Sequence, residues 1–371
     1  MKRLLLVLSL SILMVSGFSQ DFFREQFKPR KQYVILVNPT AGNLETVKFL
    51  IDRQLLDVRT RKVKFVGVYH RGQAYDFSQS RRFIEQNNLG RDFFLHEVRS
   101  NLQEADLFRE NGCTPDLQTI FRNSIGVIFF GGPDIPPTVY GQENTHSEVT
   151  DPVRHWFETT FLFHLLGSSR NPGYRALLEQ KPAYLVTGFC LGLQTMNVAT
   201  GGTLYQDIPA LVYGKKTAAE TLEIGRANLH RNYWQEISND PQLMRINLHT
   251  IRFTDHPFFV KKVKAWKNME PRVLSSHHQS IDQLGAGLEV TALSPDGKVI
   301  EAVAHSRFPN VFAVQFHPEV PALYEPREAL KFHPDDTPLS YVQIIGKTSQ
   351  KFHQKYWKYL SAIIQTAKNR P

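Results

Sequence analysis

Cysteine is scarce in this chain of 371 residues, which contains only Cys113 and Cys190. No cysteine comes directly after the N-terminal apolar run, so we expect no lipoprotein anchor. An oxidising compartment would favour a disulfide between the two, but the surroundings of Cys190 suit a reactive thiol that a bridge would consume. We therefore predict two free thiols, and no chemical role for Cys113 in the turn-rich segment 111–115.

Internal repeats, low-complexity tracts and nucleic-acid-binding modules are also absent from the sequence. A hydrophobic content of 42% is sufficient for one large core and excludes a disordered chain. The formal net charge of +9 favours binding to acidic substrates or anionic envelope surfaces. Nucleic acid is not the expected partner, because the sequence has no nucleic-acid-binding module. We predict no nucleic-acid partner and no cofactor, and the sequence leaves the oligomeric state open.

The first residues have the pattern of a secretory signal peptide. Met1-Lys2-Arg3 precedes an apolar run over residues 4–15, and a small-x-small cleavage pattern follows within residues 16–20. The run is too short and wrongly flanked for a stable membrane span. We predict cleavage after Ser19 and a periplasmic or secreted chain without stable membrane insertion, with an uncleaved anchor as the alternative.

Residues 20–371 predict a single α/β domain. Near-continuous apolar runs that end in turn residues are typical of buried parallel strands, and they occur at 33–39, 63–69, 93–98 and 126–130. Helical or mixed segments separate these runs, including an amphipathic helix over 151–166. This alternation predicts a mostly parallel sheet covered on both faces, a three-layer α/β sandwich. Residues 21–32 are charged and are predicted to tether the signal peptide to the body.

Two regions lie outside this alternation. Residues 211–271 are rich in arginine, histidine and aromatic residues, and predict an insertion of mixed structure beside the site, with an ordinary packed excursion as the alternative. Residues 321–371 predict a C-terminal helical extension. Its apolar residues recur every four positions and lie opposite three lysines. We expect the apolar face to dock on the body rather than bind a membrane. They are Phe352, Tyr356, Leu360 and Ile364, opposite Lys351, Lys355 and Lys358.

The most informative segment is GFCLGLQ, residues 188–194. Residues 181–187 predict a buried strand and residues 195–199 a helix, so Cys190 falls where a strand turns sharply into a helix. Gly188 and Gly192 would permit the strained turn that raises a nucleophile above the edge of a sheet. Unpaired N–H groups at the helix N-terminus favour the thiolate. A buried structural cysteine is the alternative.

A second segment supplies a base for this thiol. Residues 311–319 predict an alternating strand that ends in His317 and Glu319. Side chains two residues apart on a strand share a face, so Glu319 could hold and polarise His317 while His317 faces Cys190. His317 follows Cys190 by 127 residues, so only the fold can bring them together.

These segments resemble the class I glutamine amidotransferase-like superfamily, which has a flavodoxin-like fold. They are most similar to its γ-glutamyl peptidase branch, which includes γ-glutamyl-γ-aminobutyrate hydrolase. The family usually carries arginine after its nucleophile, where this chain has Leu191, as related amidotransferases do. The departure therefore bears on substrate class more than on catalysis. Further similar segments, in the family's order, are 129–136, Asp151 with Arg154 and Glu158, 201–209, 276–279 and 296–302.

The resemblance implies a cysteine hydrolase that cleaves γ-glutamyl amide or isopeptide bonds of a small substrate through a thioester. Cys190, His317 and Glu319 form the predicted triad. The backbone N–H of Leu191 directly follows the nucleophile and is one predicted oxyanion donor; the resemblance implies Gly132 as the second. Three residues are predicted to bind the glutamyl group: Gln194, one helical turn beyond Cys190, and, from the resemblance, His278 and Gln279.

Two other functions share these residues. One is a glutaminase subunit that delivers ammonia to a synthetase, and the other is a non-catalytic binding protein. Predicted export without a synthetase domain favours the hydrolase over the first, and an intact triad favours it over the second. His277 and His278 are adjacent, without a spaced set of cysteines or carboxylates, so we predict no metal site. Arg154 and Glu158 are predicted to pair structurally on a helix face.

Overall fold

The computed structural model of the protein describes residues 21–367. The predicted signal peptide, 1–19, lies outside the described residues. Within the described range, no helix has the length and apolarity that crossing a membrane requires.

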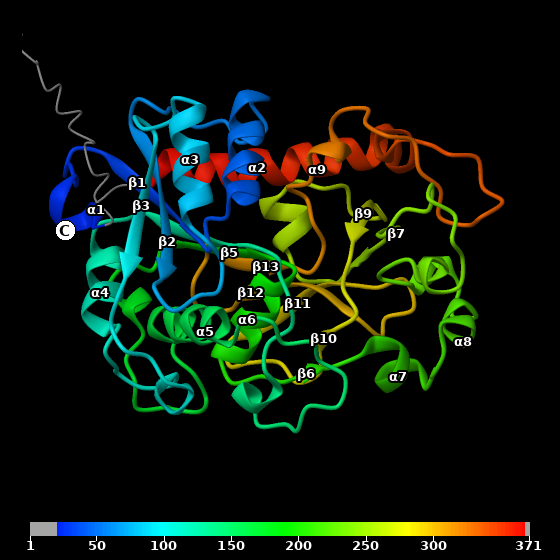
Figure 1. Ribbon diagram of the computed structural model, residues 1–371, viewed down its shortest axis with the longest axis horizontal. Coiled ribbons are helices and arrows are strands. Elements are labelled where there is room, and N and C mark those ends of the chain that lie inside the picture. The colour runs from blue at the N-terminus through cyan, green and yellow to red at the C-terminus, as the bar shows by residue number, and fades with distance from the viewer. Residues whose placement is uncertain (1–20, 368–371) are drawn as a thin grey trace, which may run out of the picture.

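A nine-stranded sheet forms the centre of the molecule (Figure 1), in the order β3-β2-β1-β4-β5-β13-β12-β11-β8. Neighbouring strands from β3 to β13 are parallel, and β12, β11 and β8 continue the sheet in antiparallel pairs. The predicted mostly parallel sheet is confirmed. The strands are β1 (Gln32–Val37), β2 (Val63–His70), β3 (Phe93–Val98), β4 (Gly126–Phe129), β5 (Leu185–Phe189), β8 (Arg252–Phe253), β11 (Leu288–Leu293), β12 (Ile300–His305) and β13 (Val311–Val314).

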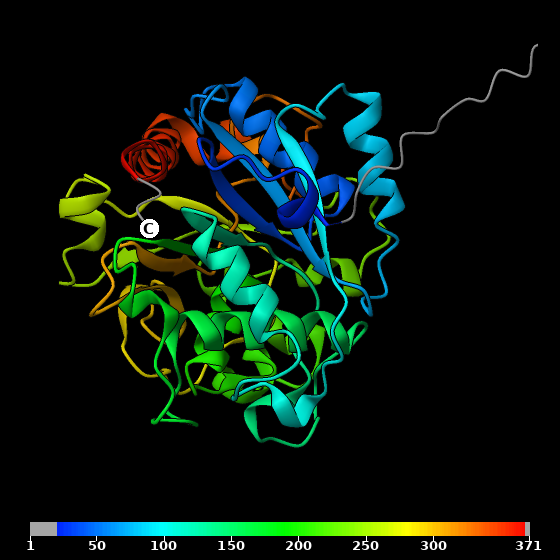
Figure 2. The ribbon, with the colours of Figure 1, turned by 90° about the vertical axis from the view of Figure 1, so that its left-hand side faces the viewer.

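Helices cover both faces of this sheet, as the three-layer prediction requires. Tyr33, Ile35 and Val37 of β1 face one core, and Val34 and Leu36 face the other, because side chains alternate along a strand. In Figure 2 the red and blue helices lie on one side of the strands and the green helices on the other. The first core packs on α4 (Thr114–Arg122), α5 (Pro152–Leu166) and α6 (Leu191–Ala199), and the second on α2 (Ala41–Asp52), α3 (Ser78–Gln86) and α9 (Tyr341–Thr366).

Two predicted strands differ from the observed ones near the site. β5 runs over Leu185–Phe189 rather than 181–187, so the strand continues to the residue before Cys190. β13 ends at Val314 instead of continuing to residue 319. The N–H of Gln315 still donates to the carbonyl of Glu301 in β12 at 2.8 Å, and the backbone then leaves the sheet, where the N–H of His317 donates to the carbonyl of Leu274 at 2.9 Å. His317 and Glu319 therefore lie on a loop.

The predicted N-terminal tether was wrong. Residues 22–25 form the short helix α1 (Phe22–Glu25), and the side chains of Phe22 and Phe23 are buried in the core. The Phe22 ring meets that of Tyr33 edge-on at 5.1 Å. The charged residues of this segment suggested an exposed tether. Burial of the two phenylalanine side chains instead stabilises its packing on the body.

Residues 211–271 divide into two parts. The first contains the end of α7 (Ile208–Tyr213), then α8 (Ala218–Leu222), and lies at the right of Figure 1. The second joins the body, because β8 extends the sheet and Phe258 and Phe259 enter the core. Two small sheets flank this region, β6 (Leu204–Tyr205) with β10 (Ser280–Ile281), and β7 (Asn247–Thr250) with β9 (Arg272–Ser275). Short turns of helix are η1 (Glu104–Asp106), η2 (Pro137–Tyr140), η3 (Leu177–Glu179), η4 (Arg226–Asn228), η5 (Tyr233–Glu236), η6 (Phe258–Lys262) and η7 (Pro321–Leu323).

The C-terminal helix α9 docks its apolar face on the body. The four predicted core residues, Phe352, Tyr356, Leu360 and Ile364, are buried. The helix begins at Tyr341 rather than near residue 321, and it kinks at Gly346, whose φ of 70° is accessible to glycine. α9 is therefore part of one helical layer rather than an appendage.

Candidate active site

Three neighbouring parallel strands end at the same edge of the sheet, and each delivers one part of the site. Gly131 and Gly132 follow β4, Cys190 follows β5, and the loop with His317 follows β13. The carboxyl ends of parallel strands are the usual position of binding sites in open α/β sheets. This topology brings together residues that are distant in the sequence.

Cys190 occupies a strained turn between β5 and α6. Its φ of 51° and ψ of −107° are unusual for a residue with a side chain. The backbone N–H of Cys190 donates to the carbonyl of Val314 at 2.9 Å, and its own carbonyl accepts from the N–H of Leu193 at 3.0 Å. The turn is therefore fixed on both sides, as in a nucleophile elbow.

The flanking glycines have a different role from the predicted one. Neither Gly188 nor Gly192 has a positive φ, so the strain falls on Cys190 itself. A Cβ on Gly188 would lie 2.7 Å from the carbonyl carbon of Gly192, and a Cβ on Gly192 would lie 2.7 Å from the oxygen of Phe129. Both positions require glycine because α6 packs directly against the ends of β4 and β5.

His317 and Glu319 form a close pair beside Cys190. The Nδ1 atom of His317 lies 2.7 Å from Oε1 of Glu319. A Cβ on Gly131 would lie 2.7 Å from Cε1 of His317 and 3.5 Å from Cβ of Cys190, so both side chains border that glycine. Burial alone would lower the pKa of His317, but the Glu319 carboxylate and the Cys190 sulfur raise it well above its usual value. This environment stabilises an imidazolium next to the thiol.

Sequence reasoning did not find Trp357 of α9, which supports the loop of this pair. Its indole N–H lies 3.2 Å from the carbonyl oxygen of Pro318, between His317 and Glu319, and 2.7 Å from the hydroxyl of Tyr324. The Tyr324 hydroxyl donates to the same carbonyl. The aromatic content of the tail was visible in the sequence, but no pattern there indicated contact with a loop before it.

Arg154 and Glu158 do pair on α5, with Arg154 Nε 2.8 Å from Glu158 Oε1, but Arg154 also holds the loop after β4. Its Nη2 donates to the carbonyl of Gly131 at 2.9 Å. A Cβ on Gly132 would lie 2.1 Å from Arg154 Nη1, so a side chain at this position would displace the guanidinium. The predicted oxyanion donor Gly132 thus rests against a buried guanidinium.

The three predicted glutamyl-binding residues lie close together, and all make internal contacts. Gln194 Nε2 donates to the carbonyl of Gln279 at 3.2 Å. Gln279 Nε2 donates to Ser147 Oγ at 2.8 Å and to the carbonyl of Gln206 at 3.1 Å. Both glutamines are buried. Their binding role stays a prediction, in which a substrate would replace part of this network.

His278 lies between two carboxylates that sequence reasoning did not single out. Its Nε2 is 3.0 Å from Asp134 Oδ2, and its Nδ1 is 3.1 Å from Asp207 Oδ2. Burial alone would lower the pKa of His278, but these hydrogen bonds raise it to about 9. His278 is therefore cationic at neutral pH and links the loop after β4 to the N-terminus of α7, where Asp207 caps the N–H of Ala210 at 2.8 Å.

Asp207 also lines a neighbouring cavity of about 310 Å³ in the first part of the 211–271 region. Lys215, Lys216 and Arg231 line the same cavity. Lys215 pairs with Glu223 at 2.7 Å, and Arg231 pairs with Glu236, which also lines the cavity, at 3.2 Å. A substrate with both an ammonium and a carboxylate would find complementary charge in this area.

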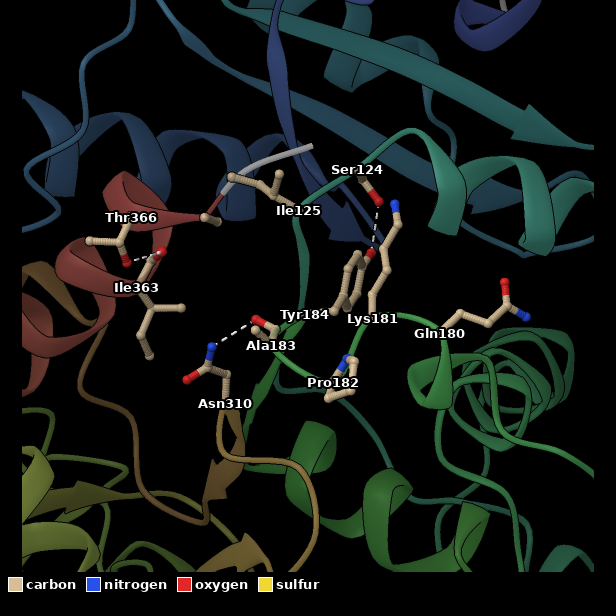
Figure 3. A pocket seen from close by; sticks show the side chains of 11 residues that line it. Ser124, Ile125, Gln180, Lys181, Pro182, Ala183, Tyr184, Asn310, Ile363 and Thr366 are labelled. Atoms are coloured by element: carbon tan, nitrogen blue, oxygen red, sulfur yellow. Dashed lines mark hydrogen bonds between the residues drawn. The ribbon is translucent and has the colours of Figure 1, made fainter. Parts of the chain in front are cut away.

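A larger cavity of about 390 Å³ lies at the opposite edge of the sheet (Figure 3). Its lining residues precede β4, β5 and β13: Ser124 donates to or accepts from the Tyr184 hydroxyl at 2.7 Å, and Asn310 donates to the carbonyl of Ala183 at 2.7 Å. Because the amino ends of these strands lie far from their carboxyl ends, this cavity is not part of the site at Cys190.

Comparisons with known proteins support a single family. The sequence model of the peptidase C26 family matches residues 110–319. The chain is 30% identical to the "Putative glutamine amidotransferase-like protein YvdE" of Lactococcus lactis subsp. lactis, over 52% of this chain and 65% of that protein. It is 31% identical to the "Putative glutamine amidotransferase Rv2859c" of Mycobacterium tuberculosis, over 52% and 50%. The match thus spans about half to two-thirds of these relatives.

The solved structure of a putative GMP synthase protein from Thermoplasma acidophilum aligns with 90% of this chain and 94% of its own. The TM-score is 0.38 and the sequence identity is 10%. The family match includes the loop after β4, the Cys190 turn and the His317–Glu319 loop. The chain belongs to the peptidase C26 family, within the class I glutamine amidotransferase-like superfamily.

Proposed function

We propose that this protein is a secreted or periplasmic cysteine hydrolase that cleaves γ-glutamyl amide or isopeptide bonds. The observation that carries the proposal is the strained Cys190 turn beside the His317–Glu319 pair, whose Nδ1–Oε1 distance is 2.7 Å. Strain at a residue with a side chain is a common property of catalytic positions, and a paired histidine can accept and return a proton.

In the proposed reaction His317 takes the proton of the Cys190 thiol, the sulfur attacks the γ-carbonyl carbon, and a tetrahedral oxyanion forms. The backbone N–H groups of Leu191 and Gly132 stabilise this oxyanion, and each donor is worth about 3 kcal/mol. His317 then gives its proton to the amine as the C–N bond breaks, which leaves a thioester. Water attacks the thioester and His317 takes the water proton. As the C–S bond breaks, His317 returns this proton to the sulfur, which restores the thiol and releases glutamate.

The charges around the site support a zwitterionic glutamyl group. Asp134 and Asp207 flank a single cationic His278, so this group carries an excess negative charge that suits an α-ammonium. Lys216 and Arg231 line the adjoining cavity and suit carboxylates, including those of a larger leaving group. Binding energy from the glutamyl end positions the scissile carbonyl, so its loss should lower kcat as well as raise KM.

A glutaminase is the second candidate, because two relatives carry the name glutamine amidotransferase. The deciding experiment offers the purified mature chain glutamine, γ-glutamyl amides of larger amines, and amides that lack the α-carboxylate, with products identified by mass spectrometry. We expect turnover of the larger γ-glutamyl amides without a partner protein. Preference for glutamine alone would favour the glutaminase, and equal turnover of the decarboxylated amides would refute γ-glutamyl specificity.

A further inference from the structure

A second group of polar side chains is buried apart from the triad. It contains His230 from the segment after η4, His277 from the loop after β9, and Glu301 of β12. One ligand atom from each residue lies within 4.8 Å of the others. All three residues are more than nine-tenths buried, and Glu301 is fully buried. No sequence pattern indicated the group, because its members come from three distant segments.

The polar atoms that face this group lack hydrogen-bond partners. Five buried atoms make no hydrogen bond: both ring nitrogens of His230, both carboxylate oxygens of Glu301, and Nε2 of His277. His230 Nδ1 lies 3.0 Å from Glu301 Oε1, but the pair does not have hydrogen-bond geometry. Polar groups buried without partners cost about 1–3 kcal/mol each, and more when charged. Several unpartnered polar atoms buried in one place indicate a ligand-binding site.

The neighbouring contacts orient the imidazoles as metal ligands. His277 Nδ1 lies 2.8 Å from the carbonyl oxygen of Gln279. A carbonyl only accepts, so Nδ1 carries the proton and the Nε2 lone pair faces the group. Metal-binding histidines characteristically donate their second N–H to a carbonyl in this way. His249 differs, because its Nδ1 lies 2.9 Å from the carbonyl of Thr250 but its Nε2, 3.6 Å from Glu301 Oε1, is already bonded to Ser275 Oγ at 2.7 Å.

We propose that His230, His277 and Glu301 bind a divalent transition-metal cation, with zinc as the best-suited ion. Imidazole nitrogens and a carboxylate are zinc ligands, with bonds of about 2.0–2.2 Å. Closing the widest pair of donors onto one ion requires side-chain shifts of about 1 Å. His249 Nε2 is 3.6 Å from Glu301 but is bonded to Ser275 Oγ, so the three residues His230, His277 and Glu301 form the proposed set and His249 lies outside it.

The site would have a structural role. It joins β12 of the main sheet to the 211–271 region through His230, and to the segment with His278 and Gln279 through His277. Because the donors are buried, the ion would enter as the chain folds and add its binding free energy to the stability of the folded state.

The test uses the full-length chain, as processed on export, with Cys190→Ala as the background, so that no thiolate at the triad can bind metal. The protein is purified without a polyhistidine tag, and zinc is measured by plasma mass spectrometry. We expect about one zinc per chain, a lower Tm after chelation, and the ligand-field spectrum of four-coordinate Co²⁺ after exchange. Glu301→Gln should reduce the bound zinc at least tenfold.

The control is Glu289→Gln, which alters an exposed carboxylate that also pairs with a histidine, His256, at 3.1 Å. This variant should keep its zinc. Folded background protein that holds less than a tenth of an equivalent, after refolding in excess Zn²⁺, would overturn the proposal. If Glu301→Gln does not fold, the zinc content and Co²⁺ spectrum of the background protein decide. None of these measurements depends on hydrolysis, so they are independent of the proposed function.

Discussion

The backbone N–H of Cys190 donates to the carbonyl oxygen of Val314 at 2.9 Å. Val314 is the last residue of β13, so the strained turn is bonded to the strand that leads to His317. The relative position of nucleophile and base is therefore set by main-chain pairing between neighbouring strands. Side-chain substitutions at the triad should leave this framework intact.

Cys190→Ala should reduce turnover at least a hundredfold, because it removes the nucleophile. It deletes one buried sulfur and keeps the turn, so the Tm should change little. Product release measured by mass spectrometry, with circular dichroism and a thermal melt on the same sample, checks both expectations. A folded variant that keeps more than a few per cent of wild-type activity would exclude the proposed mechanism.

Glu319→Gln should shift the pH dependence of kcat/KM. The carboxylate helps to hold the pKa of His317 well above its usual value, so its removal lowers that pKa. The imidazolium that protonates the leaving amine is then lost at lower pH, and the alkaline limb moves in that direction. Activity should fall less than in His317→Ala, which removes proton transfer altogether. An alkaline limb that does not move would show that Glu319 does not act on His317.

Gly132→Ala should lower kcat about a hundredfold, the effect of losing one oxyanion donor. A Cβ there would lie 2.1 Å from Arg154 Nη1, so it displaces the guanidinium that holds the carbonyl of Gly131, and the loop loses this support. Gly42→Ala is the control, since a Cβ at Gly42 meets nothing within 4 Å and the residue lies in α2. The control should keep full activity and gain about 0.5–1 kcal/mol in stability. Wild-type kcat in Gly132→Ala would remove this loop from the mechanism.

Trp357→Phe should lower the free energy of unfolding by about 1 kcal/mol, the net value of a lost hydrogen bond. It keeps most of the buried volume but removes the contacts to Pro318 and Tyr324. Because Pro318 separates His317 from Glu319, kcat should also fall while KM stays nearly constant. Denaturant melts and steady-state kinetics measure the two effects, and an unchanged kcat would limit Trp357 to a packing role.

Arg231→Glu should raise KM about fivefold for γ-glutamyl amides whose amine carries a carboxylate, the scale of one exposed charge interaction. The same change should have little effect on uncharged amines. Lys351→Glu alters an exposed charge on α9 and serves as the control. Equal KM changes for both substrate types would separate Arg231 from leaving-group binding.

The sequence was most informative where local chemistry determines structure. The run over residues 93–98 matched β3 at both ends, and the glycines around Cys190 located the turn. It was least informative where distant segments meet. The end of β13 depends on a hydrogen bond from His317 to Leu274, and the role of Arg154 depends on a carbonyl that precedes it by 23 residues. The cation His278 is explained only by Asp134 and Asp207, which come from separate loops.

The position of α9 has a consequence for folding. This helix covers one face of the sheet, and Gln32 of β1 donates to the carbonyl of Ala367 at its end, 335 residues along the chain. Contacts over such a separation form late, because they close long loops. The indole of Trp357 reaches Pro318 from the same helix. The loop that carries His317 and Glu319 should therefore be held in its final position only after α9 has docked.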